Sequence, residues 1–218
     1  MAANPVVIIG TSMSSCTRRV AAICKFVGVE YTIREVSLDN LKTPEHLSLH
    51  PFGQIPVLED PEDGFLVYGK SESRAIARYI VQNYAPGSTL VPRADDARAV
   101  ARFEAVCSVE MADFDGIVSE LVHETLFKRW FGGVVDEARC KVLASQLQPK
   151  LDGYERILSK STYLAGETLT LADLFHLPFA YMLEKHMESD EMQKRPNVAR
   201  WWNDISSRPE WIAVRDGA

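Results

Sequence analysis

The strongest constraint on the fold of this chain is a change in its hydrophobic pattern at residues 85–88, Ala-Pro-Gly-Ser. Before this break, short apolar runs alternate with segments of helical periodicity. From residue 95 onward the apolar residues recur only at helical spacing, and Pro and Gly mark the change. The sequence therefore predicts a domain at 1–85 that mixes strands and helices, a linker at 86–94 and an all-helical domain at 95–218.

The first domain is expected to form an α/β layer with a mixed, four-stranded sheet. The apolar run Val-Val-Ile-Ile-Gly at 6–10 predicts a buried strand that ends at a glycine turn, and the segment Asp-Pro-Glu-Asp-Gly at 60–64 has the residues of a hairpin turn. The predicted order is strand, helix, strand, short helix, strand, strand, helix. The ranges in that order are 6–10, 14–27, 31–36, 44–49, 55–58, 65–68 and 72–84.

The second domain carries a clear helix-start signal at Thr170-Leu171-Ala172-Asp173. Thr170 is expected to cap the helix, and the side chain of Asp173, at the third helical position, is expected to accept from the backbone N–H of Thr170, as in a capping box. Leu169 and Leu174 have the spacing of a hydrophobic staple around the same helix start. This segment is a folding signal for the helical domain.

Composition narrows the classes of partner. The formal net charge is −6, which disfavours nucleic acid as the main partner because phosphate binding needs clustered Lys and Arg. No apolar run approaches the roughly 20 residues of a membrane helix, and the first apolar run is too short for a signal-peptide core. The four cysteines form no CxxC pair and no metal-ligand spacing, so reduced thiols in the cytoplasm are the expected state.

Ordered motifs along nearly the whole chain resemble those of the cytosolic glutathione transferases, and of their phi class in particular. In the first half these are Pro-Phe-Gly-Gln-Ile-Pro at 51–56, Glu-Ser-Arg-Ala-Ile at 72–76 and the catalytic-turn segment at 13–20. The matching segments of the second half are Phe114-Asp115, Phe127-Lys128 followed by Gly132, 163–166, 169–174, 195–198, Trp201-Trp202 and 208–211. The resemblance implies a thioredoxin-like glutathione-binding domain followed by an all-helical domain.

By this resemblance, Ser14 stabilises the thiolate of glutathione. The thiolate is the nucleophilic form of a thiol, and lowering a thiol pKa by about two units corresponds to roughly 2.7 kcal/mol. A hydroxyl hydrogen bond together with the positive end of a helix supplies stabilisation of that order. The alternative is that Ser14 is only an N-cap, since serine is a preferred cap in any protein.

The resemblance also places the remaining glutathione contacts. Pro56 would be a cis-proline that turns the backbone of Ile55 toward the cysteinyl part of glutathione, as a peptide adds to a sheet edge. The helix start at Glu72 and Ser73 suits the γ-glutamyl end, while Gln54 adds amide hydrogen bonds there. At the other end, Lys42 would pair with the glycyl carboxylate.

Two features complicate this picture. Cys16 lies two residues after the matched serine, and some relatives use a cysteine in this turn for thiol exchange through a mixed disulfide. The competing interpretation, a small half-buried residue, is the more common one for a free cysteine. Leu41 stands where the family often has a polar residue for the glycyl carboxylate, so weaker glutathione binding is expected.

The electrophile pocket is expected between the two domains, where ligand pockets are often found. By resemblance, Met13 forms one wall. His123 and Phe127 are four residues apart and share a helix face, at positions that contact the second substrate. His123 is also compatible with a solvated helix face.

The expected function is an enzyme that conjugates glutathione to electrophilic small molecules and also reduces organic hydroperoxides. Glutathione is the co-substrate, and no cofactor, metal, nucleic acid or membrane is expected to take part. One alternative is a ligandin-type protein that binds glutathione conjugates or apolar small molecules without turnover; Cys16-dependent thiol transfer and an interaction domain are others. The resemblance also implies a homodimer, and the mixed apolar and charged helix start from Arg98 to Met111 is compatible with an interface.

Overall fold

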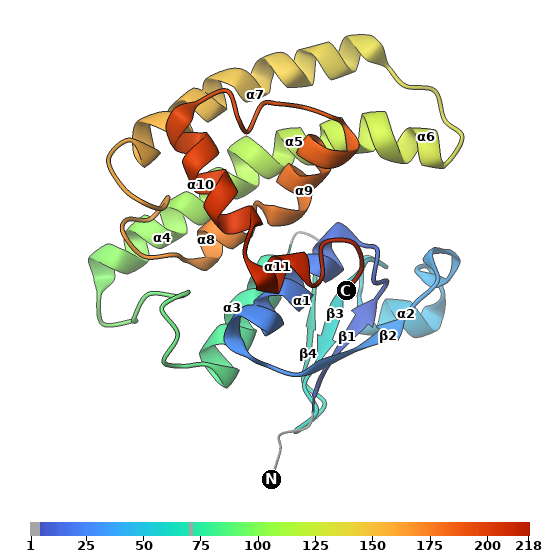
Figure 1. Cartoon of the computed structure of the whole chain (residues 1–218). Helices are drawn as coiled ribbons and strands as arrows, with labels where there is room; N and C mark the ends of the chain where they lie inside the picture. Colours follow the sequence, from blue (N-terminus) through green and yellow to red (C-terminus); the bar gives the residue numbers. More distant parts are fainter. Residues whose placement is uncertain (1–4, 70–71) are drawn as a thin grey trace. The chain divides into compact units, whose positions relative to one another are not determined.

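The computed structural model describes residues 5–69 and 72–218 (Figure 1). Two compact units divide the chain: one runs to Ser88 and includes Arg208–Ala218, and the other is Thr89–Ser207. The break in pattern at residues 85–88 thus falls next to the boundary. The last eleven residues differ from the expectation of a helical domain that continues to residue 218, because they pack with the first unit.

The first unit contains a four-stranded sheet in the order β2-β1-β3-β4. Strands β1 and β2 are parallel, whereas β1 with β3 and β3 with β4 are antiparallel, so the sheet is mixed as predicted. The central strand β1 pairs on both sides, which explains its unbroken apolar sequence. The strands are β1 (Val6–Gly10), β2 (Tyr31–Glu35), β3 (Val57–Glu59) and β4 (Leu66–Tyr68).

Three helices of the first unit, α1, α2 and α3, follow the predicted order, and α1 packs against α3; η1 and α11 are additional to the prediction. Ser14 caps the start of α1. Gly28 ends the helix in the left-handed conformation, at φ 69°, and its N–H donates to the carbonyls of Cys24 and Lys25. The helices are α1 (Ser15–Val27), the 3₁₀ turn η1 (Leu38–Asn40), α2 (Pro44–Leu49), α3 (Ser73–Tyr84) and α11 (Pro209–Ile212).

Two strand starts differ from the sequence expectation. Strand β3 begins at Val57 rather than at residue 55, because Pro56 has no N–H to give to a neighbouring strand. Strand β4 begins at Leu66 because the N–H of Phe65 donates to the Asp63 carboxylate, 2.9 Å away, within the hairpin turn. The turn itself has the predicted chemistry, with Gly64 at φ 75°.

The C-terminal segment is held to α1 by specific contacts. The guanidinium of Arg18 donates to the carbonyl of Arg215, and the N–H of Ala218 donates to the Ser12 carbonyl at 3.2 Å. Helix α11 packs on α1, and Trp211 is fully buried. Burial of this indole explains why the segment belongs to the first unit rather than to the helical one.

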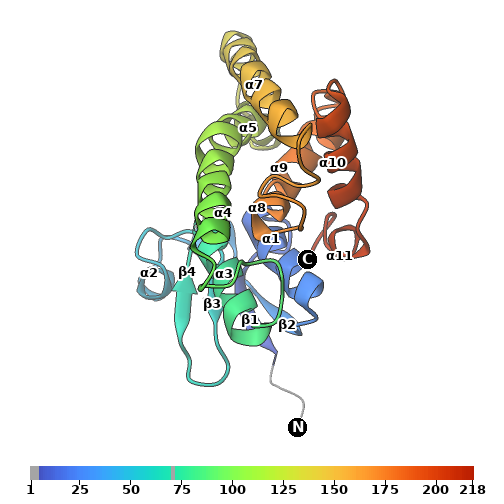
Figure 2. The same ribbon diagram turned by 90° about the vertical axis from the view of Figure 1, so that its left-hand side faces the viewer.

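The second unit is helical. A continuous helical stretch from Ala97 to Trp130 includes two π-helical turns, and α7 lies alongside its α5 section (Figures 1 and 2). The elements are α4 (Ala97–Val109), η2 (Glu110–Asp115), α5 (Gly116–Val122), η3 (His123–Phe127), α6 (Lys128–Trp130), α7 (Glu137–Leu158), α8 (Leu171–Leu174), α9 (Leu177–Tyr181), η4 (Met182–His186) and α10 (Pro196–Ser206). The described residues contain no helix long and apolar enough to cross a membrane.

The predicted capping box is present at the start of α8. The buried carboxylate of Asp173 accepts hydrogen bonds from the N–H and hydroxyl of Thr170, at 2.9 and 3.0 Å. It also accepts from the N–H of Leu164 at 2.9 Å and the indole of Trp201 at 3.0 Å. Burial raises the pKa of Asp173, and these hydrogen bonds act against that rise. One carboxylate therefore joins the helix start to a preceding loop and to α10.

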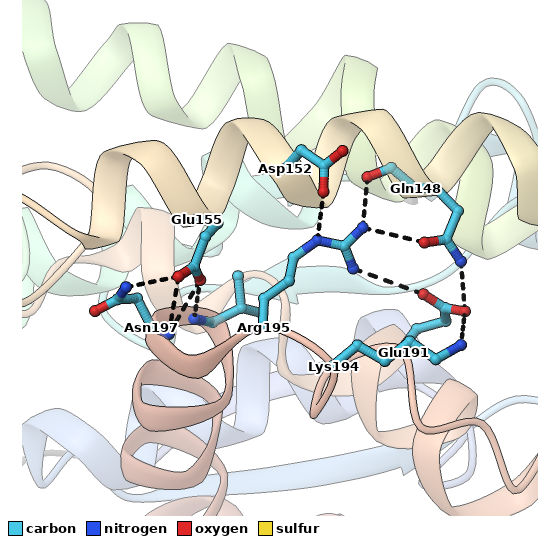
Figure 3. Close-up of polar contacts among 8 residues, drawn as sticks. Gln148, Asp152, Glu155, Glu191, Lys194, Arg195 and Asn197 are labelled. Atoms are coloured by element: carbon cyan, nitrogen blue, oxygen red, sulfur yellow. Dashed lines mark hydrogen bonds and ion pairs between the residues drawn. The ribbon is translucent and has the colours of Figure 1, made fainter.

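A second polar network joins α7 to the start of α10 (Figure 3). Arg195, the residue before α10, provides no side-chain cap. Instead the Glu155 carboxylate on α7 accepts from the N–H groups of Asn197 and Val198, at 3.0 and 3.1 Å. The Arg195 guanidinium in turn donates to Asp152, at 2.7 Å. The Arg-Pro-Asn-Val motif of the sequence thus has a structural role, in which a carboxylate from another helix satisfies the exposed amides of α10.

Candidate functional site

The candidate site in the first unit begins at the turn between β1 and α1. The N–H of Ser14 donates to the Thr11 carbonyl at 3.0 Å, which places the hydroxyl at the start of α1. Its oxygen accepts from the N–H of Thr17 at 3.5 Å, a long cap contact that uses only the acceptor side of the hydroxyl. The cap role and the capacity of Ser14 to donate a hydrogen bond are therefore compatible.

The start of α1 is electrostatically suited to an anion. Its first turn contains no acidic residue that would neutralise the positive end of the helix dipole. Met13, directly before Ser14, is 63% exposed, so the turn is open to solvent on that side. Cys16 differs from Ser14 in being buried, with only 7% of its surface exposed.

The start of α3 is the second position in this unit where the sequence predicts an anion contact. Glu72 is the exposed residue before the helix, and the first turn of α3 also lacks acidic residues. Ser73 is fully buried, and its hydroxyl oxygen accepts from the Arg19 guanidinium at 2.9 Å. Since Arg19 only donates, the Ser73 hydrogen remains able to donate to a carboxylate.

The loop before β3 carries Gln54 and Ile55. The bond between Ile55 and Pro56 is cis, as the resemblance implied. Gln54 is half-buried and its carbonyl lies 2.8 Å from Nε2 of His46. Within the described part of the chain, neither backbone group of Ile55 takes part in an intrachain hydrogen bond. The backbone N–H and C=O of Ile55, directly before β3, are thus left available to a ligand.

Lys42 is exposed and contacts the same loop. Its ammonium donates to the Phe52 carbonyl at 2.6 Å. Gly53 permits this close approach: it has φ 59°, and a Cβ there would lie 2.3 Å from the Leu41 carbonyl. Leu41 itself is half-buried. Because its side chain is aliphatic, it adds no polar group at this end of the loop.

The sequence reasoning missed three residues of this region: Arg19, His46 and His50. Arg19 supports Ser73, and the two histidines contact the loop that carries Gln54. The spacing of His46 and His50, four apart on a short helix, is a signal that they share a face. No local pattern in the sequence pairs Arg19 with a residue 54 positions later.

In the helical unit, His123 and Phe127 lie in edge-to-face contact, with ring centroids 6.1 Å apart. Trp130 continues this row at 5.4 Å from Phe127, and His186 lies 6.3 Å from Trp130. His123 is exposed and Phe127 is half-buried. Met13 belongs to the first unit and these rings to the second.

A separate hollow of about 270 Å³ lies within the helical unit. Its lining is mainly apolar, with a polar rim that includes Lys141 and Glu191. The apolar lining residues are Leu121, Ala144, Leu147, Leu183 and Met187. Neither His123 nor Phe127 lines it.

Within residues 5–69 and 72–218 no group of three His, Cys, Asp or Glu side chains is arranged to hold a metal ion. Burial raises the pKa of Cys24, in the middle of α1, to about 12, so this thiol stays protonated near neutral pH.

Comparisons with known proteins agree with this geometry. Residues 13–82 match the family model described as glutathione S-transferase, N-terminal domain, and residues 121–209 match glutathione S-transferase, C-terminal domain. Glutathione S-transferase PM239X14 of Arabidopsis thaliana is 45% identical over 196 residues, 88% of each chain.

Solved structures agree as well. Glutathione transferase F7 from Populus trichocarpa superposes with a TM-score of 0.88 at 32% identity, over 96% of this chain and 97% of the other. Glutathione S-transferase I from maize, solved in complex with an atrazine glutathione conjugate, gives a TM-score of 0.85 at 28% identity over 97% of both chains. The matched region includes both helix starts and the loop between them.

Proposed function

Since this chain belongs to the glutathione transferase family, in its phi class, we propose that it is a serine-type enzyme in which Ser14 stabilises the thiolate of glutathione for attack on small electrophiles. The observation that carries this proposal is the position of Ser14. Its hydroxyl lies at the start of α1, whose first turn contains no acidic residue. The cap contact uses this hydroxyl only as an acceptor, so its hydrogen is left to donate. Both features favour a bound anion.

The other anchors would hold the tripeptide at its two ends. The γ-glutamyl carboxylate would bind at the start of α3, where Ser73 donates and the helix amides point outward, and Glu72 would accept from the neighbouring ammonium. Gln54 would add side-chain hydrogen bonds, and the backbone of Ile55 would pair with the cysteinyl residue. Lys42 would attract the glycyl carboxylate as a point charge.

In conjugation, the thiolate sulfur forms a bond to the electrophilic carbon while the leaving group departs with the electron pair of its bond. Ser14 would stabilise the thiolate through a hydrogen bond, and the anchors would supply orientation. Met13, His123 and Phe127 would contact the second substrate; a structural relative that holds an atrazine glutathione conjugate supports an aromatic electrophile. The same thiolate would reduce an organic hydroperoxide to an alcohol, with a second glutathione giving the disulfide and water.

This proposal is tested by a panel of aromatic halides, unsaturated carbonyl compounds and organic hydroperoxides, each assayed with glutathione. Turnover is expected with members of the panel, and glutathione omission should abolish it. Tight binding of S-methylglutathione with no turnover on any member would contradict the enzymatic role. That result would favour a binding protein instead.

The ligandin-type alternative is favoured by one observation, the 270 Å³ hollow of the helical unit with its apolar lining. A pocket of this composition suits a small apolar ring with one polar substituent. Such binding would be independent of glutathione. It would therefore persist when Ser14 is replaced.

We predict that Cys16 does not act as the nucleophile. Cys16→Ser should keep conjugation within about a factor of three of the wild-type rate, because a buried residue behind Ser14 contributes mainly packing. The measurement is conjugation and deglutathionylation by both proteins. Robust thiol transfer in the wild type that disappears in Cys16→Ser would identify Cys16 as the reactive group.

We also predict a homodimer. Exposed apolar side chains support this, among them Met111 in η2 at 49% exposure and Phe52 in the loop before β3 at 66%. Two-fold dimers are the commonest form of oligomer. Light scattering behind size exclusion should give about twice the chain mass of 24.4 kDa, whereas a mass near that of one chain would refute the prediction.

A further inference from the structure

His46 of α2 and His50, the residue directly after α2, form a buried pair next to the proposed glutathione loop. His46 and His50 lie one helical turn apart, with stacked rings whose centroids are 6.5 Å apart and whose planes differ by 22°. His46 is 4% exposed and His50 is fully buried. Histidine is seldom fully buried without a reason, since each ring carries a nitrogen that must donate and another that must accept.

His46 acts on the end of the loop. Its Nε2 lies 2.8 Å from the carbonyl oxygen of Gln54. A carbonyl oxygen only accepts, so Nε2 of His46 must carry the hydrogen. This hydrogen bond fixes the backbone of Gln54 directly before Ile55.

His50 acts on the start of the loop. The N–H of Phe52 donates to Nδ1 of His50 at 3.2 Å, and the N–H of Gly53 donates to the His50 carbonyl at 2.8 Å. Nδ1 must therefore present a lone pair, which makes the ring neutral with its hydrogen on Nε2. A protonated ring would point a second N–H at the Phe52 amide and lose this contact.

The segment 51–55, which both histidines contact, carries two of the proposed anchors, Gln54 and Ile55, and it contacts a third, Lys42. The Phe52 carbonyl meets the Lys42 ammonium, Gly53 lies tightly against Leu41, and Gln54 and Ile55 follow. A change at the Phe52 amide is thus passed on to both ends of the glutathione site.

We propose that His50 is a positioning residue for glutathione, in which the neutral imidazole holds residues 51–55 in the binding conformation and protonation of the ring releases them. The inference rests on the proposed function, because it assigns a control to the same site. Glutathione affinity should be full where the ring is neutral and should fall as the pH drops through the pKa of His50.

The charged and titratable groups around His50 set the pH at which its ring becomes protonated. Burial lowers the pKa of His50, and His46 and Lys42 act in the same direction, while Glu72 at the start of α3 opposes them. The Tyr68 ring of β4 packs on the imidazole, with centroids 5.0 Å apart. Nε2 of His50 is buried with no hydrogen-bond partner in the described structure, so a proton added to the ring would place an unpaired charge there. The transition is thus expected below the ordinary histidine value of about 6.5.

The test measures binding of S-methylglutathione by calorimetry between about pH 5 and pH 7. This probe has no thiol, so thiolate formation does not contribute. Three proteins are compared: wild type, His50→Asn and His50→Leu. In His50→Asn, the side-chain oxygen can accept a hydrogen bond from the N–H of Phe52, as in an Asx turn, but the side chain does not change its charge with pH.

For the wild type, the dissociation constant should rise towards acid pH, by up to about tenfold per pH unit below the pKa of His50. His50→Asn should bind like the wild type at pH 7 and lose the acid-side rise. His50→Leu should bind at least about fivefold more weakly at pH 7 because the Phe52 amide loses its acceptor. A rise that persists unchanged in His50→Asn, or wild-type affinity in His50→Leu, would overturn the proposal.

A measurement on the free protein separates this proposal from the proposed function. Nitrogen-15 spectra of the imidazole at pH 7 should show the hydrogen of His50 on Nε2, and exchange of the Phe52 amide should accelerate in His50→Leu but not in His50→Asn. A hydrogen on Nδ1 would overturn the proposal even if the protein binds glutathione. If the wild type fails to bind S-methylglutathione at every pH, the proposed function fails and the positioning role fails with it.

Discussion

Replacing Ser14 by alanine is expected to lower kcat/KM for conjugation by about ten- to a thousandfold while glutathione affinity stays nearly unchanged. The estimate follows from removal of a single donor to a developing or bound anion, which costs about 10²–10³ in rate. Lys42, Gln54, Ile55, Glu72 and Ser73 would still hold the tripeptide. The thiolate absorbance of bound glutathione, measured against pH, should move its midpoint upward because the thiol loses one stabilising hydrogen bond.

Ser12→Ala is the matched control, since Ser12 lies two residues earlier in the same turn and is anchored through its backbone N–H to Glu35, at 3.0 Å. This variant should keep wild-type kinetics. If Ser14→Ala and Ser12→Ala are equally active, Ser14 is only a helix cap. If Ser14→Ala instead loses glutathione binding and keeps its rate at saturation, its role is binding rather than activation.

Replacing Asp173 by alanine is expected to lower the free energy of unfolding by about 3–5 kcal/mol. The carboxylate is fully buried and accepts four hydrogen bonds from the groups of Leu164, Thr170 and Trp201. Its removal leaves buried donors without a partner, each of which costs about 1–3 kcal/mol. Such a loss is a large share of the 5–15 kcal/mol that stabilises a typical domain.

Equilibrium unfolding in urea measures this effect, with the midpoint and the slope both recorded. Asp95→Ala is the control, because Asp95 pairs with Arg93 on the exposed surface, where an ion pair adds little to stability. A loss below 1 kcal/mol in Asp173→Ala would show that the helix start is stabilised by packing alone. The turn that carries Ser14 belongs to the other unit, so folded Asp173→Ala protein should keep the proposed thiolate chemistry.

The amino-acid sequence by itself determined the family, the enzyme class and the order of strands and helices from β1 to α3. It also determined the hairpin turn at 60–64 and the capping box at Thr170. These features are local: backbone periodicity, turn residues and caps depend on neighbours within a few positions. The family motifs are local as well, which is why Pro56 could be assigned as the cis-proline before the structure was known.

The tertiary structure alone decided which distant side chains meet. It paired Arg19 with Ser73, placed His46 and His50 against the loop at 51–55, and joined Arg18 to the Arg215 carbonyl so that the last residues pack with the first unit. Each of these contacts depends on how helices pack once the sheet has formed. Periodicity reports only which face of a helix is apolar, whereas the partner of a buried polar group is set by the packing that brings it within hydrogen-bond distance.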